Sequence, residues 1–332
     1  MDVLRGFAAL LIILLHATLV MERLGGKPEP TLVTLGVAWA GFRMPLLMIL
    51  SGMLLPRALD KPAETYLTGK ISNVLYPYLL WVAIFGVACV PENLLSPWLW
   101  IGGDYLWFLL FLFSYYLIAL PLRAIPTGVL IVLAAALSFG SPDGGVHTEQ
   151  YFFLMAMFFV GKFLAEKGDL FEWLSSRKAA LLTTICAVAV PVVTSSREAA
   201  KYEVEYGLLI VGAVLFLMWA AKSVASKDVS RPLKFIGRNA VVYYVVHYPI
   251  IFLISLACLR MGIEEAAVIS LLSLIAALAI STALSLLRVR KGWGEWLYVL
   301  PAPARRVLGV SIRRLLSWMT LPHCKAQTKE FS

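Results

Sequence analysis

A series of long apolar runs, separated by short polar loops, dominates the sequence. There are ten such runs. A helix needs about 20 apolar residues to cross a bilayer, and the fifth and sixth runs are short for a span. Only helices and closed barrels satisfy their backbone hydrogen bonds in lipid. The pattern therefore predicts an all-α polytopic membrane protein with about ten transmembrane helices. The ten runs cover residues 3–20, 33–55, 74–90, 99–121, 125–139, 150–165, 179–194, 205–221, 239–258 and 266–287.

Composition supports this interpretation. Of 332 residues, 60% are hydrophobic and 15% are charged, whereas a soluble domain carries roughly 25% charged residues. A soluble chain could not bury so much apolar surface, so a soluble protein is excluded. The four cysteines lack metal-site spacing and three lie in apolar runs, which predicts free thiols and no metal site. They are Cys89, Cys186, Cys258 and Cys324.

The positive charges are unevenly distributed between the two sets of loops. Most of the 29 lysines and arginines fall on one side of the expected spans and in the tail. The positive-inside rule then places both termini in the cytoplasm and the chain in the inner (plasma) membrane. The net charge of +9 indicates a basic rim facing anionic membrane lipids rather than a nucleic-acid partner. The few cations of the opposite side are Arg23, Lys27, Arg197, Lys201 and Arg260.

Two regions are expected along the chain. Residues 1–290 form a transmembrane domain, and residues 291–332 form a basic cytoplasmic tail. Within the tail, residues 301–320 alternate basic and apolar side chains but are too short to span. They predict an interfacial amphipathic helix on the inner leaflet.

The first apolar run carries two ionisable side chains, Arg5 and His16. Eleven residues place them within about 20° of the same helix face and roughly 16 Å apart along the axis. A guanidinium at the membrane rim suits phosphate, and an imidazole at depth suits proton transfer. Two other interpretations stay open: Arg5 as a membrane anchor paired with Asp2, and His16 as a histidine satisfied by a neighbouring helix.

The second and ninth runs add Arg43 and His247. Arg43 falls near the bilayer centre, where insertion of arginine costs roughly 2.5–3.5 kcal/mol, and Pro45 predicts a kink beside it. A structural ion pair is an alternative for Arg43, with Asp104 as the candidate partner. His247 lies about 12 Å along its helix. Together with His16, these residues indicate a polar site within the membrane.

Five segments in register resemble the acyltransferase-3 family of integral membrane acyltransferases, over roughly residues 1–285. The sequence departs from the family at one point. Family members often carry two basic residues three positions apart just before the third span, whereas this chain has Lys70 and then Asn73. The five segments are Asp2-Val3-Leu4-Arg5-Gly6 with His16, Phe42-Arg43-Met44-Pro45 with Ser51-Gly52, Tyr76-Pro77-Tyr78-Leu79-Leu80-Trp81, Tyr105-Leu106-Trp107-Phe108-Leu109, and Tyr243-Tyr244-Val245-Val246-His247.

The resemblance implies a membrane O-acyltransferase. Such an enzyme moves an acyl group, usually acetyl from cytoplasmic acetyl-CoA, to a hydroxyl of a saccharide or lipid-linked glycan at the outer side. No permanently bound cofactor is expected, and acyl-CoA is the donor substrate. Under this interpretation Arg5 and Lys70 contact the donor, and His16 is the general base on the acceptor hydroxyl or on an acyl-carrying intermediate. Arg43 stabilises the oxyanion or holds the carbonyl, and His247 orients a group or relays a proton. The residues expected to line the cavity, with packing as the alternative role, are Ser51, Tyr76 and Trp107.

A transporter or flippase for an anionic or glycan substrate is the alternative, because the same buried cations could form its binding site. Transporters often contain inverted repeats and paired broken helices, and the sequence shows neither pattern. This difference favours the enzyme. Consumption of acetyl-CoA by the purified protein distinguishes the two.

Overall fold

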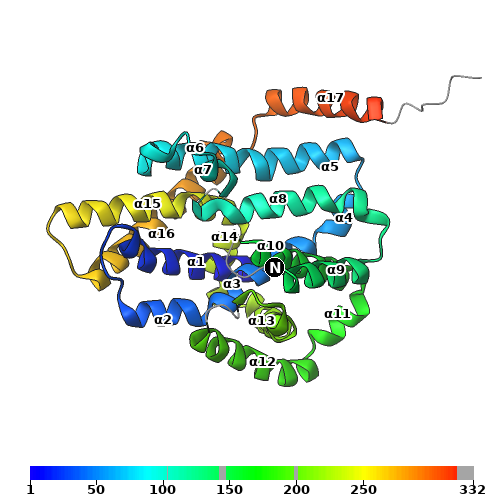
Figure 1. Cartoon of the computed structure of the whole chain (residues 1–332), viewed down its shortest axis with the longest axis horizontal. Coiled ribbons are helices and arrows are strands. Elements are labelled where there is room, and N and C mark those ends of the chain that lie inside the picture. The colour runs from blue at the N-terminus through cyan, green and yellow to red at the C-terminus, as the bar shows by residue number, and fades with distance from the viewer. Residues whose placement is uncertain (103, 142–146, 198–200, 320–332) are drawn as a thin grey trace, which may run out of the picture.

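The structure is a computed structural model that describes residues 1–102, 104–141, 147–197 and 201–319. These residues form helices and no strands (Figure 1). Eight helical segments are long and apolar enough to cross a membrane, which confirms a multi-pass helical protein but not the predicted number of ten spans. The eight segments are Asp2–Arg23, Pro30–Gly52, Ala63–Cys89, Pro97–Ala119, Arg177–Ser196, Val204–Ala225, Ala240–Arg260 and Ala266–Arg290.

The two remaining apolar runs form α9 (Thr127–Phe139) and α10 (Thr148–Glu166), which pack against each other. Lys162 interrupts the apolar surface of α10. Its Nζ donates to Thr127 Oγ1 of α9 at 2.5 Å and pairs at 2.7 Å with Glu166 of α10 itself, which compensates the charge. Because α10 also packs against α3, it belongs to the interior of the bundle.

Two spans are interrupted helices. In the second, α2 (Pro30–Ala38) and α3 (Ala40–Gly52) are separated at Trp39. The helix is thus interrupted six residues before Pro45, which lies inside α3, rather than at the predicted position. In the third span, α5 (Ala63–Lys70) and α6 (Tyr76–Cys89) flank a π-helical turn at Ile71–Leu75.

Pro77 explains how the π turn is satisfied. In an i→i+5 register the residue at position 77 would donate to the Ser72 carbonyl, but proline has no N–H. The backbone N–H of Leu300 donates to this carbonyl instead, at 3.1 Å. The segment after the last span therefore completes the third span.

Glycines allow close helix crossings that fix the positions of α1 and α3. A Cβ on Gly52 or Gly161 would overlap the backbone of the other helix, so α3 and α10 cross at contact distance. Gly6 of α1 (Asp2–Arg23) and Gly237 of α14 (Arg231–Arg238) make the same kind of crossing. Gly52 of the Ser51-Gly52 motif thus serves helix packing.

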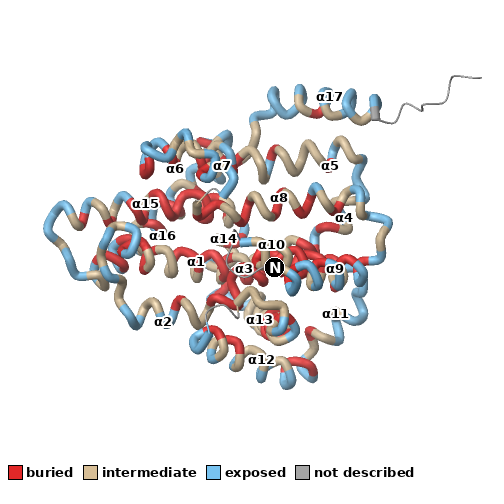
Figure 2. The backbone as a smooth tube through the Cα atoms, viewed as in Figure 1, coloured by how far each residue is buried: buried red, intermediate tan, exposed pale blue. Residues whose placement is uncertain are grey.

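Burial separates an interior group of helices from a peripheral group (Figure 2). Helix α1 lies at the centre and contacts α3, α14, α15 and α16. By contrast, α12 exposes a row of apolar side chains that includes Leu181, Ile185 and Val188, as a lipid-facing helix must. The elements not yet bounded are α4 (Leu55–Leu59), α7 (Pro97–Gly102), α8 (Trp107–Ala119), α11 (Gly168–Leu174), α12 (Arg177–Ser196), α13 (Gly207–Ala225), α15 (Ala240–Arg260), α16 (Ala266–Lys291) and α17 (Ala302–Met319).

The tail contains the helix that the basic and apolar alternation predicts. Helix α17 runs beside α5 (Figure 1), and the Arg313 guanidinium forms two hydrogen bonds with Glu64, at 2.7 and 2.9 Å. Its outer face exposes Val307, Leu315 and Trp318. Binding of this face to the inner leaflet stays a prediction.

Candidate active site

The two histidines from the first and ninth apolar runs form a hydrogen-bonded pair between α1 and α15. His16 Nδ1 lies 2.8 Å from His247 Nε2, and His247 Nδ1 lies 3.0 Å from the Tyr243 carbonyl. A carbonyl can only accept, so His247 Nδ1 carries a proton and its Nε2 accepts one from His16 Nδ1. In the neutral pair, His16 Nε2 therefore keeps a lone pair, which is the state that a general base requires.

Tyrosine rings hold this pair in place. The Tyr248 ring stands edge-on to His16 at 5.1 Å and stacks on the Tyr105 ring at 4.9 Å. The Tyr105 hydroxyl donates to the Val245 carbonyl at 2.5 Å, and the Tyr244 hydroxyl donates to the Tyr105 carbonyl at 2.7 Å. These bonds join the start of α8 to α15. Both imidazoles are thus fixed by residues to which the sequence analysis assigned no role.

A cavity of about 410 Å³ adjoins His16, and Arg43 and Trp107 lie in its wall. Arg43 is buried, and its Nη1 donates to the Gly36 carbonyl at 3.0 Å, which ties α3 to α2 across the interruption at Trp39. The suggested pairing of Arg43 with Asp104 is wrong, because Asp104 pairs with Arg23 at 2.5 Å. The structure thus brings His16, Arg43, His247 and Trp107 together.

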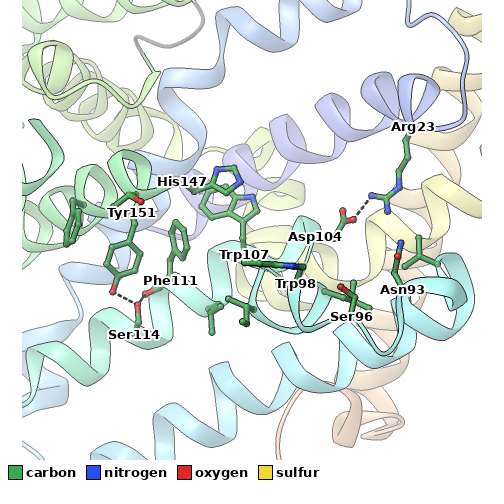
Figure 3. A pocket seen from close by; sticks show the side chains of 17 residues that line it. Arg23, Asn93, Ser96, Trp98, Asp104, Trp107, Phe111, Ser114, His147 and Tyr151 are labelled. Carbon is green, nitrogen blue, oxygen red and sulfur yellow. Dashed lines mark hydrogen bonds and ion pairs between the residues drawn. The ribbon is translucent and has the colours of Figure 1, made fainter. Parts of the chain in front are cut away.

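A second, larger cavity of about 720 Å³ shares two wall residues with the first, Trp107 and His147 (Figure 3). Arg23 and Asp104 lie at one end, and Ser114 and Tyr151 lie at the other. The two hydroxyls at the latter end are 2.8 Å apart. The two cavities together form a continuous lining from the ion pair to the histidine pair.

His147 is a site residue that the sequence analysis missed. It precedes α10 with a left-handed backbone conformation (φ 53°), and its Nδ1 lies 3.0 Å from Gln150 Oε1. Because that oxygen only accepts, the imidazole donates through Nδ1 and retains an acceptor at Nε2. A single histidine in a polar loop has no periodic pattern around it, so no sequence signal could have indicated this position.

Of the predicted donor contacts, Arg5 lies in the first turn of α1, at the other end of the helix from His16, and Lys70 is the last residue of α5. Arg5 pairs with Asp2 at 3.5 Å and keeps a quarter of its side chain exposed. Lys70 Nζ lies 3.3 Å from the centre of the Tyr116 ring, a cation–π contact. Both cations thus have a local partner, Asp2 for Arg5 and the Tyr116 ring for Lys70.

Ser51 and Tyr76 are not brought to the histidine pair. The Ser51 hydroxyl donates to the Leu47 carbonyl of its own helix at 2.7 Å, and it lies eight residues, or roughly 12 Å, along α3 from Arg43. The Tyr76 hydroxyl donates to the Trp296 carbonyl at 2.8 Å, so it ties α6 to the segment that follows α16. In the part of the chain that the structure describes, no group of three His, Cys, Asp or Glu side chains could hold a metal ion.

The site is thus an interior histidine pair beside a buried arginine, in a bundle with helices of membrane-spanning length. Residues 1–289 match the family described as an acyltransferase domain, the acyltransferase-3 family, and the chain belongs to it. No curated protein and no solved structure matches the chain significantly.

Proposed function

We propose that the protein is an O-acyltransferase that moves an acetyl group from cytoplasmic acetyl-CoA to a hydroxyl of a saccharide or lipid-linked glycan at the outer side of the inner (plasma) membrane. Family membership supports acyl transfer. The observation that carries the proposal is the hydrogen-bonded chain from the Tyr243 carbonyl through His247 to His16, which leaves a lone pair beside Arg43 in a cavity.

The reaction needs a base, an oxyanion contact and a proton return, and the site offers each. His16 Nε2 takes the proton of the acceptor hydroxyl while its oxygen attacks the thioester carbonyl. Arg43 stabilises the oxyanion of the tetrahedral intermediate. When the carbon–sulfur bond breaks, the departing thiolate takes the proton from His16, and the products are the ester and free CoA. His247 stabilises the transient imidazolium by accepting from His16 Nδ1.

The donor reaches this site from the opposite end of α1. Arg5 and Lys70 would hold the CoA phosphates, and the pantetheine arm would cover the roughly 16 Å to His16. Ala9 and Ile12 lie between Arg5 and His16 on that helix face and are both buried. The arm must therefore lie beside this stripe, where donor binding separates α1 from a neighbouring helix.

The proposed topology places both termini in the cytoplasm, with α9 and α10 as a further pair of spans. Eight and ten are both even, so the two ends of the membrane domain lie on the same side in either case. Single cysteines at Lys61 and Lys227 should resist a membrane-impermeant thiol reagent in intact cells, whereas one at Lys201 should react. Labelling of position 227 from outside would overturn this topology.

Release of the CoA thiol tests the function directly. The protein in lipid nanodiscs should release thiol from acetyl-CoA and form an ester when glycan extract from the native membrane is added. His16→Gln serves as the matched inactive variant. A transporter would bind glycan without consuming acetyl-CoA. Absence of ester from the surface polysaccharide of a strain that lacks the gene would identify the acceptor polymer.

A further inference from the structure

We infer that the acceptor is an amphiphile, and that its apolar chain lies in the larger cavity, in the slot between α8 and α10. Its neutral, hydroxyl-bearing head lies at the boundary with the His16 cavity. The inference rests on the proposed function, because it assigns the acceptor of that same site. It replaces a choice between a soluble saccharide and a lipid-linked one with a single class.

The lining of the larger cavity carries its ion pair, Arg23 and Asp104, at one end only. Arg23, Asp104 and Asn93 lie at one end, whereas Leu110, Phe111 and Phe152 line the part between α8 and α10 (Figure 3). On one side this part is lined by α8, which belongs to the segment of membrane-spanning length Pro97–Ala119. A soluble sugar would leave that apolar surface unused, whereas an alkyl or prenyl chain would bury it.

The slot lies on a different face of α8 from the basic residues. Tyr116 follows Trp107 by nine residues, which is a rotation of about 180° on a helix. Lys70 lies against Tyr116, so a donor held there is on the opposite side of α8. Leu117, on the same stripe as Leu110, is 41% exposed and faces the surroundings of the bundle. The stripe of α8 that lines the slot therefore continues beyond it onto an exposed apolar surface, from which a membrane-bound amphiphile can approach.

The slot has a defined floor. Ser114 Oγ and Tyr151 OH lie 2.8 Å apart, and the Tyr115 hydroxyl donates to the Tyr151 carbonyl at 2.6 Å. Trp107 and Ser114 are seven residues apart on α8, so the slot extends roughly 10 Å from the cavity boundary. It accommodates the first part of a chain, and the rest would continue into lipid.

The polar end suits a neutral head. Asp104 compensates the charge of Arg23 at 2.5 Å. The ion pair therefore has no net charge to attract a phosphate. Trp107 and His147 form the boundary between the cavities. An indole face and an imidazole Nε2 acceptor together suit a sugar, which has apolar C–H faces and donor hydroxyls. A hydroxyl held there is next to the His16 cavity.

Photolabelling tests the slot without requiring turnover. The probe is an octyl glucoside that carries a diazirine in its alkyl chain, added below its critical micelle concentration to the full-length protein in lipid nanodiscs. Labelled peptides should map to 107–114 and 148–152. Competition by unlabelled alkyl glucosides should strengthen by roughly fourfold for each added methylene until the slot is filled, and glucose should not compete.

Two matched variants separate the slot from general lipid exposure. Leu110→Trp fills the slot and should reduce labelling of 148–152 about sixteenfold, the effect of two methylenes left unburied. Leu117→Trp places the same side chain on the same face of α8, beyond Ser114 and therefore outside the slot. Labelling of this variant should equal that of the wild type. Labelling confined to lipid-facing α9 and α12, or equal loss in both variants, would overturn the inference. Slot labelling by a protein that never releases CoA thiol would instead count against the proposed function alone.

Discussion

The two ends of α1 carry the two groups on which the proposed chemistry depends, and they are built differently. At one end His16 is hydrogen-bonded to α15 and enclosed by tyrosine rings. At the other end Arg5 pairs with Asp2 of its own first turn and stays partly exposed. A general base must be held in one tautomer and one orientation, whereas a phosphate contact must be accessible and charged. The His16 end of α1 thus holds its side chain in one geometry, whereas the Arg5 end leaves its side chain accessible to a phosphate.

Replacement of His16 should have the largest effect on activity. His16→Gln removes the proton acceptor, and loss of a general base typically lowers the rate by about 10²–10⁴-fold. His247→Gln should retain measurable turnover, because a glutamine oxygen can still accept from His16 Nδ1 and keep its tautomer. The measurement is kcat for CoA thiol release in nanodiscs. Equal and total loss in both variants would indicate a shared two-histidine mechanism, and robust turnover of His16→Gln would remove the assignment.

Arg43 belongs to the His16 end, and its replacement should have the next largest effect. Arg43→Gln removes the charge proposed to stabilise the oxyanion, and loss of such a contact lowers kcat by about 10²–10³-fold. Since Arg43 also donates to the Gly36 carbonyl, folding must be measured beside it, by size-exclusion profile and thermal unfolding. Loss of activity in proportion to the loss of folded protein would make Arg43 a structural link between α2 and α3.

Arg5 tests the opposite end of α1, where a change in affinity is expected instead of a change in kcat. Arg5→Ala should raise the KM for acetyl-CoA about tenfold, which corresponds to ~1.4 kcal/mol of binding. Arg238→Ala is a matched control, because Arg238 also lies near Asp2, at 3.9 Å, but is 66% exposed on α14. If the two variants have the same KM, Arg5 is only an anchor, as one interpretation of the sequence allowed.

The polar site was predictable from the sequence because ionisable residues at membrane depth must face a common interior. His16, Arg43 and His247 have no other place to satisfy their polar atoms, and their convergence follows from burial alone. Family membership was predictable from five motifs in register, and residues 1–289 confirm it.

Other features had no signal in the sequence. Arg23 and Asp104 are 81 positions apart, and an ion pair between the last residue of α1 and the turn before α8 leaves no periodic pattern. The interruption at Trp39 lies between Gly36 and Gly41, six residues before Pro45, the residue from which a kink was expected. The count of ten spans is not confirmed: α9 has only 13 residues and α10 carries Glu149, Lys162 and Glu166, so neither is among the eight helices long and apolar enough to cross a membrane.

The smallest predicted effect concerns Tyr76, which the family resemblance suggested for the cavity. The structure gives its hydroxyl a different partner, the Trp296 carbonyl, and the neighbouring Trp81 donates to the Leu297 carbonyl at 2.8 Å while stacking on Tyr298. Both residues thus hold the same segment against α6. Tyr76→Phe keeps the ring and removes one hydrogen bond, so it should lower stability by about 0.5–1.5 kcal/mol.

Trp81→Phe is the matched comparison for Tyr76→Phe. Trp81 is 7% exposed, so its replacement removes a hydrogen bond and also leaves a space in a buried ring stack, which lowers stability further. Thermal unfolding should therefore rank wild type above Tyr76→Phe and Tyr76→Phe above Trp81→Phe, and tryptic cleavage between residues 288 and 306 should accelerate in the same order. A cavity-lining role for Tyr76 predicts another result: the KM for acetyl-CoA would rise while the thermal transition and the cleavage rate stayed at their wild-type values.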